Sequence, residues 1–397
     1  MVFQRCDILS NDSEKMENSL KIILFLGLVS LFSDITYEGG RSVFGPYLFL
    51  LGASAATVGF ISGLGELIGF AFRFLSGYLA DRTGKHWAFV FVGYFINLFS
   101  VPLVGFMQKW ESVSFLILME RFGKALRTPA RDAIIAQSLK PEKRGFGFGL
   151  HEALDQIGAF SGPLIMAFLV YFFGSYQKGL LFLFFPALLA ITFLFLARRS
   201  STDGRIAKED TKLHLSFRPK REFLLYVSGM CLFGAGFCDF SLISFHLRKS
   251  GFPDSYIPVL YAFAMAIDGV SAPFFGKLYD RLGLKVIFPP LFFSSLSPVF
   301  VFTGELSSVI AGMFFWGIGM AVHESIARAH VANLAPPNSK GRVFGIFNGA
   351  FGLSWFLGSS LLGIVYEISI SWVVIFSCGI QLFSILFISL AMDKKTQ

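Results

Sequence analysis

The stretch Gly77-Tyr78-Leu79-Ala80-Asp81-Arg82-Thr83-Gly84-Lys85 is a short charged turn between two long apolar runs. The turn returns 199 residues later as Gly276-Lys277-Leu278-Tyr279-Asp280-Arg281-Leu282-Gly283-Leu284-Lys285, with Gly, Leu, Asp, Arg and Gly at matching offsets. Half of the 397-residue chain has about this length. The simplest explanation is a duplicated unit that carries the same charged turn in each copy.

The composition of the chain indicates a membrane protein. Hydrophobic residues make up 54% of the sequence, charged residues only 15%, and 51 residues are phenylalanine. A soluble core of this size needs far less apolar surface. The net charge of +8 therefore belongs to loops rather than to a nucleic-acid interface, and we expect no nucleic-acid partner. Four scattered cysteines predict neither a disulfide framework nor a metal site, and nothing indicates a cofactor.

Twelve apolar stretches are long enough to cross about 30 Å of hydrocarbon as helices. They lie near residues 21–50, 55–80, 86–108, 112–138, 145–172, 178–197, 222–248, 254–280, 285–304, 306–334, 341–367 and 371–392. The long polar interruption after the sixth stretch carries eight Lys or Arg. The sequence therefore predicts six-helix bundles at residues 21–197 and 222–392. A linker at residues 198–221 joins them, and polar tails lie at residues 1–20 and 393–397.

The basic residues predict the orientation in the membrane, because Lys and Arg near span ends favour the cytoplasmic side. With both termini inside, 22 of the 34 Lys and Arg fall in cytoplasmic segments and 4 in outer loops. The polar start of the chain has no apolar run followed by a small-residue cleavage site, which favours a cytoplasmic tail over a signal peptide. We expect a multi-pass protein of the plasma (inner) membrane with both termini cytoplasmic.

The architecture and the repeated turn resemble those of the major facilitator superfamily of secondary transporters, over essentially the whole chain. The superfamily's loop between its second and third helices is matched by Gly77, Leu79, Asp81, Arg82, Gly84 and Lys85. The resemblance implies an all-α membrane protein of twelve helices, in two pseudo-symmetric six-helix bundles around a central cavity. It also implies a monomer with a small-molecule substrate. The loop aspartate would help to latch the halves together in the outward-facing state, with a second copy at Gly276, Asp280, Arg281 and Gly283.

Ionisable residues inside the spans are candidates for function, since each costs about 2.5–3.5 kcal/mol at a helix centre. The first span holds Asp34, Glu38 and Arg41 at spacings of four and three, which places them on one helical face. The second span adds Glu66 and Arg73, seven residues apart and also on one face. These faces must point away from lipid.

The fourth span carries the densest charge of the chain. Its charged residues are Glu120, Arg121, Lys124, Arg127, Arg131 and Asp132. The four cations fall within a sector of about 120°, which cannot face lipid. In the superfamily the first, fourth, seventh and tenth helices line the cavity, and Arg121 resembles an arginine that recurs in the fourth. We expect Arg121 to pair with Asp34 or Glu38 across the cavity when substrate is absent.

The fifth span combines charges with a glycine motif. His151, Glu152 and Asp155 precede the run Gly158-Ala159-Phe160-Ser161-Gly162-Pro163. This run resembles the superfamily's antiporter motif G-x-x-x-G-P, in which Gly158, Gly162 and Pro163 are the matching residues. Two small residues four apart also allow a neighbouring helix to approach closely, so helix packing alone is the alternative interpretation.

The second half carries fewer charges in its spans. They are Asp239 and His246 in the seventh span, Asp268 in the eighth, and His323, Glu324, Arg328 and His330 in the tenth. Asp239 and Asp268 have no basic residue nearby in their own helices. Such a buried carboxylate can take up and release a proton, whereas the alternative is a salt bridge to a neighbouring helix.

These features predict a proton-coupled secondary transporter of a small organic solute, more in the manner of an exporter than of an importer. The cationic stripe of the fourth span favours an anionic or zwitterionic solute, whereas the acids favour a cation or protons. A symporter that imports a small nutrient or organic anion is the alternative within the superfamily. A lipid-modifying enzyme is disfavoured, because the sequence has no H-E-x-x-H, no G-x-S-x-G and no P-loop. We therefore expect no catalytic residues.

Overall fold

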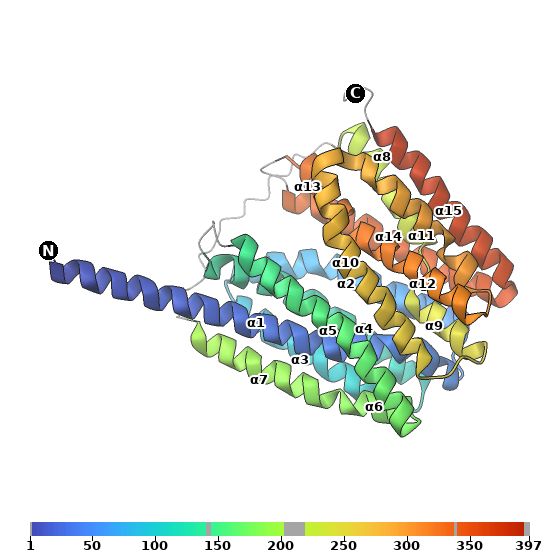
Figure 1. Ribbon diagram of the computed structural model, residues 1–397, viewed down its shortest axis with the longest axis horizontal. Coiled ribbons are helices and arrows are strands. Elements are labelled where there is room, and N and C mark those ends of the chain that lie inside the picture. The colour runs from blue at the N-terminus through green and yellow to red at the C-terminus, as the bar shows by residue number, and fades with distance from the viewer. Residues whose placement is uncertain (1, 140–143, 202–218, 337–339, 393–397) are drawn as a thin grey trace.

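The computed structural model of the chain describes residues 2–139, 144–201, 219–336 and 340–392, and these residues form helices and no strand. Two groups of helices, blue to green and yellow to red, lie side by side in Figure 1. Most of the predicted linker and the last five residues lie outside the described residues. The predicted N-terminal tail is helical from Val2 onward, and this helix protrudes from the bundle as a continuation of the first span.

The N-terminal half contains six spans. They are α1 (Val2–Leu50), α2 (Ala55–Thr83), α3 (His86–Leu103) with the short turn η1 (Val104–Phe106), α4 (Trp110–Ser138), α5 (Arg144–Phe173), and the pair α6 (Tyr176–Phe182) and α7 (Phe184–Ser200).

The C-terminal half contains the other six spans. They are the pair α8 (Arg221–Gly236) and α9 (Phe240–Lys249), then α10 (Tyr256–Leu282), η3 (Gly283–Ile287) with α11 (Phe288–Val301), the series α12 (Leu306–Ala321), η4 (Val322–Ala327) and α13 (Arg328–Leu334), then α14 (Lys340–Ile368) and α15 (Ile370–Ala391).

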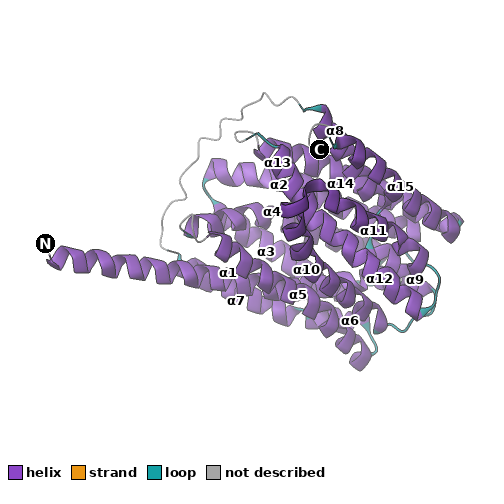
Figure 2. Ribbon diagram, turned by 45° about the horizontal axis from the view of Figure 1, so that its top comes forward, coloured by secondary structure: helices purple, strands orange, loops and turns teal. Residues whose placement is uncertain are grey.

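Ten stretches of the described chain are long and apolar enough to cross a membrane. One of them, Tyr256–Val301, contains two spans, because the chain turns back between α10 and α11. The charged helix α4 is not among the ten, yet it packs beside α2 and α3 within the bundle. The structure therefore has the twelve spans that the sequence predicts, and both views show all of them as helix (Figures 1 and 2).

The repeated turn has the same backbone feature in both copies. Gly84 ends α2 with a φ of 67°, and Gly283 ends α10 with a φ of 65°. Glycine adopts a positive φ without the steric cost that a Cβ atom brings. The amide of Gly84 donates to the carbonyl of Ala80, and that of Gly283 to the carbonyl of Tyr279. The shared glycine of the repeat therefore ends a helix at the same point of each half.

The two halves are closed together at one face of the membrane. We call this face the far side. The opposite face, where the first span begins near residue 21 and the last span ends near residue 391, is called the terminal side. On the far side Phe49 packs edge-on against Phe245, with ring centroids 5.1 Å apart, and Phe60 against Phe356 at 5.4 Å. The amide of Ala56 donates to Glu367 at 3.2 Å. These contacts join α1 to α9 and α2 to α14.

Candidate functional site

A cavity of about 740 Å³ lies between the two halves. Its walls are formed by α1, α2, α4 and α5 of the N-terminal half, and by α10, α12, η4, α13 and α14 of the C-terminal half. The lining extends to Phe148 and Gly149, exposed residues in the first turns of α5 on the terminal side. Because the far side is closed, the cavity is accessible from the terminal side.

The cavity lining is densely charged, with eight acidic and seven basic residues. Thirteen of the fifteen residues predicted from the sequence to act on substrate or protons line it: Asp34, Glu38, Arg41, Glu66, Arg73, Arg121, Lys124, His151, Asp155, Asp268, His323, Glu324 and Arg328. The other two, Glu120 and Asp239, lie behind the lining and pair with Arg121 and Arg41. The predicted charged faces of the spans therefore converge on one space.

An ion-pair network connects α1, α2 and α4. Arg41 lies 3.0 Å from Glu66 and 3.4 Å from Asp239, so this guanidinium joins the two halves. Arg121 lies 3.3 Å from Glu66 and 3.3 Å from Glu120. All five side chains are at most 13% exposed. Charges removed from water to this extent are retained only where they are paired.

The prediction that Arg121 pairs with Asp34 or Glu38 was wrong. Its guanidinium pairs with Glu66 and Glu120 rather than with Asp34 or Glu38. Glu38 instead accepts a hydrogen bond from the Tyr261 hydroxyl of α10 at 2.5 Å. The sequence shows that Arg121 and Glu38 occupy inward faces, but not which helices stand opposite each other.

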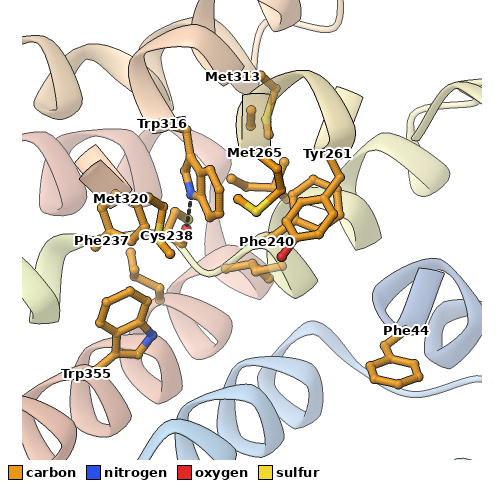
Figure 3. Packing of buried hydrophobic residues seen from close by; sticks show 14 of the residues in the cluster. Phe44, Phe237, Cys238, Phe240, Tyr261, Met265, Met313, Trp316, Met320 and Trp355 are labelled. Atoms are coloured by element: carbon orange, nitrogen blue, oxygen red, sulfur yellow. Dashed lines mark hydrogen bonds between the residues drawn. The ribbon is translucent and has the colours of Figure 1, made fainter. Parts of the chain in front are cut away.

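The seventh span is broken next to the network, between α8 and α9. Asp239 caps α9, because its carboxylate accepts from the amide of Ser241 at 2.8 Å. The carbonyl of Gly236, which ends α8, accepts from Gln381 at 3.1 Å, and that of Cys238 accepts from the indole of Trp316 at 2.8 Å (Figure 3). Broken helices occur in membranes only where neighbours satisfy the freed backbone groups. The break aims a carboxylate at Arg41.

The predicted acids of the second half have different environments. Asp239 is in a salt bridge to a neighbouring helix, which was the alternative interpretation, whereas Asp268 has no ion pair within the described chain. His323 and Glu324 lie in η4, a wider helical turn between α12 and α13. Such turns are frequent at functional sites. His323 stacks on Phe351, with centroids 4.6 Å apart, at the base of the C-terminal wall.

The glycine motif of α5 packs against α1. A side chain added at Gly162 would come within 2.7 Å of the Ile35 carbonyl, and one added at Gly158 would overlap the Leu31 carbonyl. One turn before Gly158, Asp155 accepts a hydrogen bond from Ser30 of α1. The motif therefore serves close helix packing, and it holds Asp155 at the cavity beside the acidic face of α1.

Some predicted residues lie away from the cavity. Asp81, in the last turn of α2, bonds to His86, the first residue of α3, at 2.9 Å. His246 bonds to Tyr366 at 2.8 Å, and His330 to Tyr279 at 2.9 Å, both within the C-terminal half. No group of His, Cys, Asp and Glu among the described residues is arranged to hold a metal ion.

Several lining residues carry no sequence signal. Tyr37, Phe70, Gln156 and Trp355 carry no formal charge, so the cost of burying a charge does not mark them in the sequence. Tyr261 lies outside the lining and contributes through its bond to Glu38. Only the tertiary structure identifies them.

Comparison with known proteins agrees with this architecture. The family model described as Major Facilitator Superfamily matches residues 26–359, and a second match covers residues 256–396. The chain belongs to the major facilitator superfamily. Members of this superfamily are transporters of small-molecule substrates.

Relatives within the major facilitator superfamily span nearly the whole chain. An uncharacterized protein of Mycobacterium tuberculosis is 34% identical over 373 residues, which is 92% of this chain and 91% of the relative. An uncharacterized MFS-type transporter of Methanocaldococcus jannaschii is 26% identical over 371 residues, 90% of this chain and 91% of the relative. The crystal structure of nucleoside transporter NupG has the same fold, with a TM-score of 0.73, 14% identity, and coverage of 94% of this chain and 100% of that one.

Proposed function

We propose that this superfamily member is a proton-coupled secondary transporter that exports a small organic solute by alternating access. The observation that carries the proposal is the cavity itself, which is closed on the far side and lined by carboxylates from both halves. Paired halves around one central site are the structural basis of alternating access. The proposed location is the plasma membrane with the termini in the cytoplasm, so the cavity is accessible from the cytoplasm.

Proton coupling is supported by contacts between the two halves that involve charged side chains and that hold the far side closed. Glu38 bonds across the halves to Tyr261, and Arg41 bonds across them to Asp239. Opening the far side must separate both pairs. Protonation of a carboxylate removes the charge that holds such a pair, so a proton can favour one state of the transporter over the other. Glu38, Asp34 and Asp155 are the carboxylates that we propose for this role in the N-terminal half.

Export by antiport is the proposed direction, and import by symport is the second candidate. The glycine motif that resembles the antiporter motif packs directly on α1, the helix that carries Asp34 and Glu38. Small residues at this contact allow α5 and α1 to remain close while the rest of each half moves. A proton bound on α1 therefore lies on the helix that also makes the contacts across the halves to Tyr261 and Asp239.

Proteoliposomes that contain a pH-sensitive dye test the proposal with a panel of cationic, anionic, zwitterionic and neutral organic solutes. With an acidic lumen, entry of a solute in exchange for protons makes the lumen more alkaline. Under symport, entry of a solute from a medium of equal pH makes the lumen more acidic. Liposomes without protein provide the baseline for passive entry. The proposal predicts the alkaline change, and a symporter gives the acid change instead.

A further inference from the structure

The two walls of the cavity differ in charge. Six of the seven basic lining residues belong to the N-terminal half, and only Arg328 belongs to the C-terminal half. Of the acids, Asp268 and Glu324 stand on the C-terminal wall. Arg328 forms no ion pair with either of them within the described part of the chain. The other six acids stand on the N-terminal wall and balance its six bases, whereas the C-terminal wall has two acids and one base and therefore attracts an organic cation.

Asp268 is an unpartnered acceptor on the C-terminal wall. Its side chain is 3% exposed, and its Oδ1 atom has no hydrogen-bond partner among the described residues. Glu324, Glu152 on the facing helix α5 and Glu38 on α1 lie close enough to repel its negative charge, and Arg328 lies close enough to attract it without forming an ion pair. A buried polar atom without a partner costs free energy, and the cost is greater for a charged group. The site lacks a positive hydrogen-bond donor.

The unpaired indole of Trp355 provides a second, independent observation on the same wall. Its indole is 3% exposed, it lines the cavity, and its Nε1 has no acceptor in the described structure. In contrast, the nearby Trp316 donates to the Cys238 carbonyl at 2.8 Å (Figure 3). The indole N–H of a buried tryptophan usually donates a hydrogen bond to an acceptor. The Trp355 indole therefore supplies a hydrogen-bond donor together with an aromatic face.

Apolar side chains complete the C-terminal wall. Met265, Met320 and Phe344 line it, and Phe70 of α2 extends the aromatic surface from the other half. The rings of Phe70 and His323 meet edge-on at 5.6 Å. Such a surface accommodates an apolar body, and aromatic faces also attract cations.

We infer that the C-terminal wall binds the protonated amine of an amphipathic solute. The ammonium group donates to Asp268 Oδ1, the apolar body lies against the methionines and aromatic rings, and Trp355 Nε1 donates to an acceptor on that body. An N–H-bearing amine is favoured over a quaternary ammonium, because only the former supplies the hydrogen bond that Asp268 lacks. This inference rests on the proposed function and specifies its substrate class.

Four probes that share a phenyl ring on a short carbon chain test the inference on the full-length protein in detergent. They are phenethylamine, its N-trimethyl analogue, phenylacetate and phenylethanol, and their affinities are measured by tryptophan fluorescence and by thermal shift. We expect phenethylamine to bind most tightly. We expect Asp268→Asn, which keeps the shape, to lower that affinity about tenfold or more, as removal of a charge-assisted bond does. Asp268→Glu should restore part of the affinity, which shows that the loss is not due to misfolding.

Two further variants sharpen the result. Glu111→Gln removes an exposed acid on the far side and should leave probe affinity unchanged. Trp355→Phe keeps a ring but removes the donor, so it should weaken phenylalaninamide, which carries a carbonyl acceptor, more than phenethylamine. Equal effects on the two amines contradict the role of the Trp355 donor.

The inference is overturned if phenylacetate or phenylethanol binds as tightly as phenethylamine, if no amine binds, or if Asp268→Asn leaves amine affinity unchanged. Failure of the proposed function gives a different result. Amine binding that depends on Asp268, without proton-linked movement in proteoliposomes, contradicts the transport mechanism and supports the binding site. Proton-linked movement of an anion that is unaffected by Asp268→Asn contradicts the binding site alone.

Discussion

The guanidinium of Arg41, in the N-terminal half, lies 3.4 Å from the carboxylate of Asp239, in the C-terminal half. The two residues are 198 positions apart in the sequence. Their pair stands where the first span meets the break in the seventh. It joins the halves below the far-side contacts, so the far side cannot open widely while the pair is intact.

Asp239→Asn is therefore expected to favour the state that is open on the far side. Asparagine caps a helix about as well as aspartate, so α9 keeps its cap and loses only the charge that holds Arg41. A hydrogen bond to a charged group contributes about 1.5–3 kcal/mol, which shifts an equilibrium by roughly tenfold or more.

The shift is measured with a cysteine at Ser244, a fully buried residue where α9 meets Gly45 of α1. A membrane-impermeant maleimide should label Ser244→Cys faster when Asp239→Asn is also present. The parent protein without Ser244→Cys corrects for the native cysteines. Equal labelling rates in the two backgrounds contradict a role for the pair in closure.

Gly162→Ala is expected to destabilise the protein. The added methyl group would come within 2.7 Å of the Ile35 carbonyl, so α5 must move away from α1. Overpacking of this kind costs about 1–3 kcal/mol. The control is Gly379→Ala, where nothing lies within 4 Å and alanine should stabilise the helix by about 0.5–1 kcal/mol. Thermal unfolding in detergent measures both, and an unchanged stability of Gly162→Ala argues against the close contact.

Helix faces could be predicted from the sequence, because they depend only on the helical period. The acids of the first span and the cations of the fourth line one cavity, as their spacing indicates. Their partners could not be predicted, because pairing depends on which helices meet. The sequence places no basic residue near Asp239 on its own helix and leaves a salt bridge to another helix as an alternative, and the partner Arg41 does lie on another helix.

Local distortions of the helices could not be predicted from the sequence either. The break at Asp239 is stabilised by Gln381 and Trp316, which lie far along the chain and have no local pattern that links them to it. The free indole donor of Trp355 is likewise a property of its surroundings, since Trp316 has the same donor and a partner for it. Such features depend on long-range packing rather than on propensity.

The topology predicts which loops are accessible from outside the cell. Ser175 begins α6 on the far side, whereas Ser201 follows α7 on the terminal side. An impermeant maleimide applied to intact cells should label Ser175→Cys and spare Ser201→Cys until the membrane is permeabilised. The unsubstituted protein controls for native cysteines. Labelling of Ser201→Cys in intact cells reverses the proposed orientation.

Asp81→Asn is expected to slow transport with little change in stability. The Asp81 side chain is 46% exposed and bonds to His86, the first residue of α3. Surface substitutions of this kind change stability by less than about 0.5 kcal/mol. If the aspartate holds the halves together when the far side is open, its loss destabilises that state and slows the step in which the far side opens. Transport rate and thermal unfolding are measured together, and wild-type rates in the stable variant argue against the latch.

Glu38→Gln is expected to separate solute movement from proton movement. The Glu38 carboxylate accepts from Tyr261 across the halves and lines the cavity, so its charge affects both binding and closure. Glutamine keeps an acceptor for the tyrosine but cannot exchange a proton. Exchange of labelled for unlabelled solute across a membrane without a pH gradient should therefore persist, whereas accumulation driven by the gradient should be lost.

The matched variants locate the coupling group. Tyr261→Phe leaves the carboxylate in place and should retain gradient-driven accumulation, with a changed rate because the cross-half bond is gone. Asp34→Asn should behave like wild type in both assays if Glu38 is the coupling group, and should lose gradient-driven accumulation if Asp34 is the coupling group. Should Glu38→Gln still accumulate solute against the gradient, the proton is carried elsewhere, and Asp34 and Asp155 are tested next because both line the same wall.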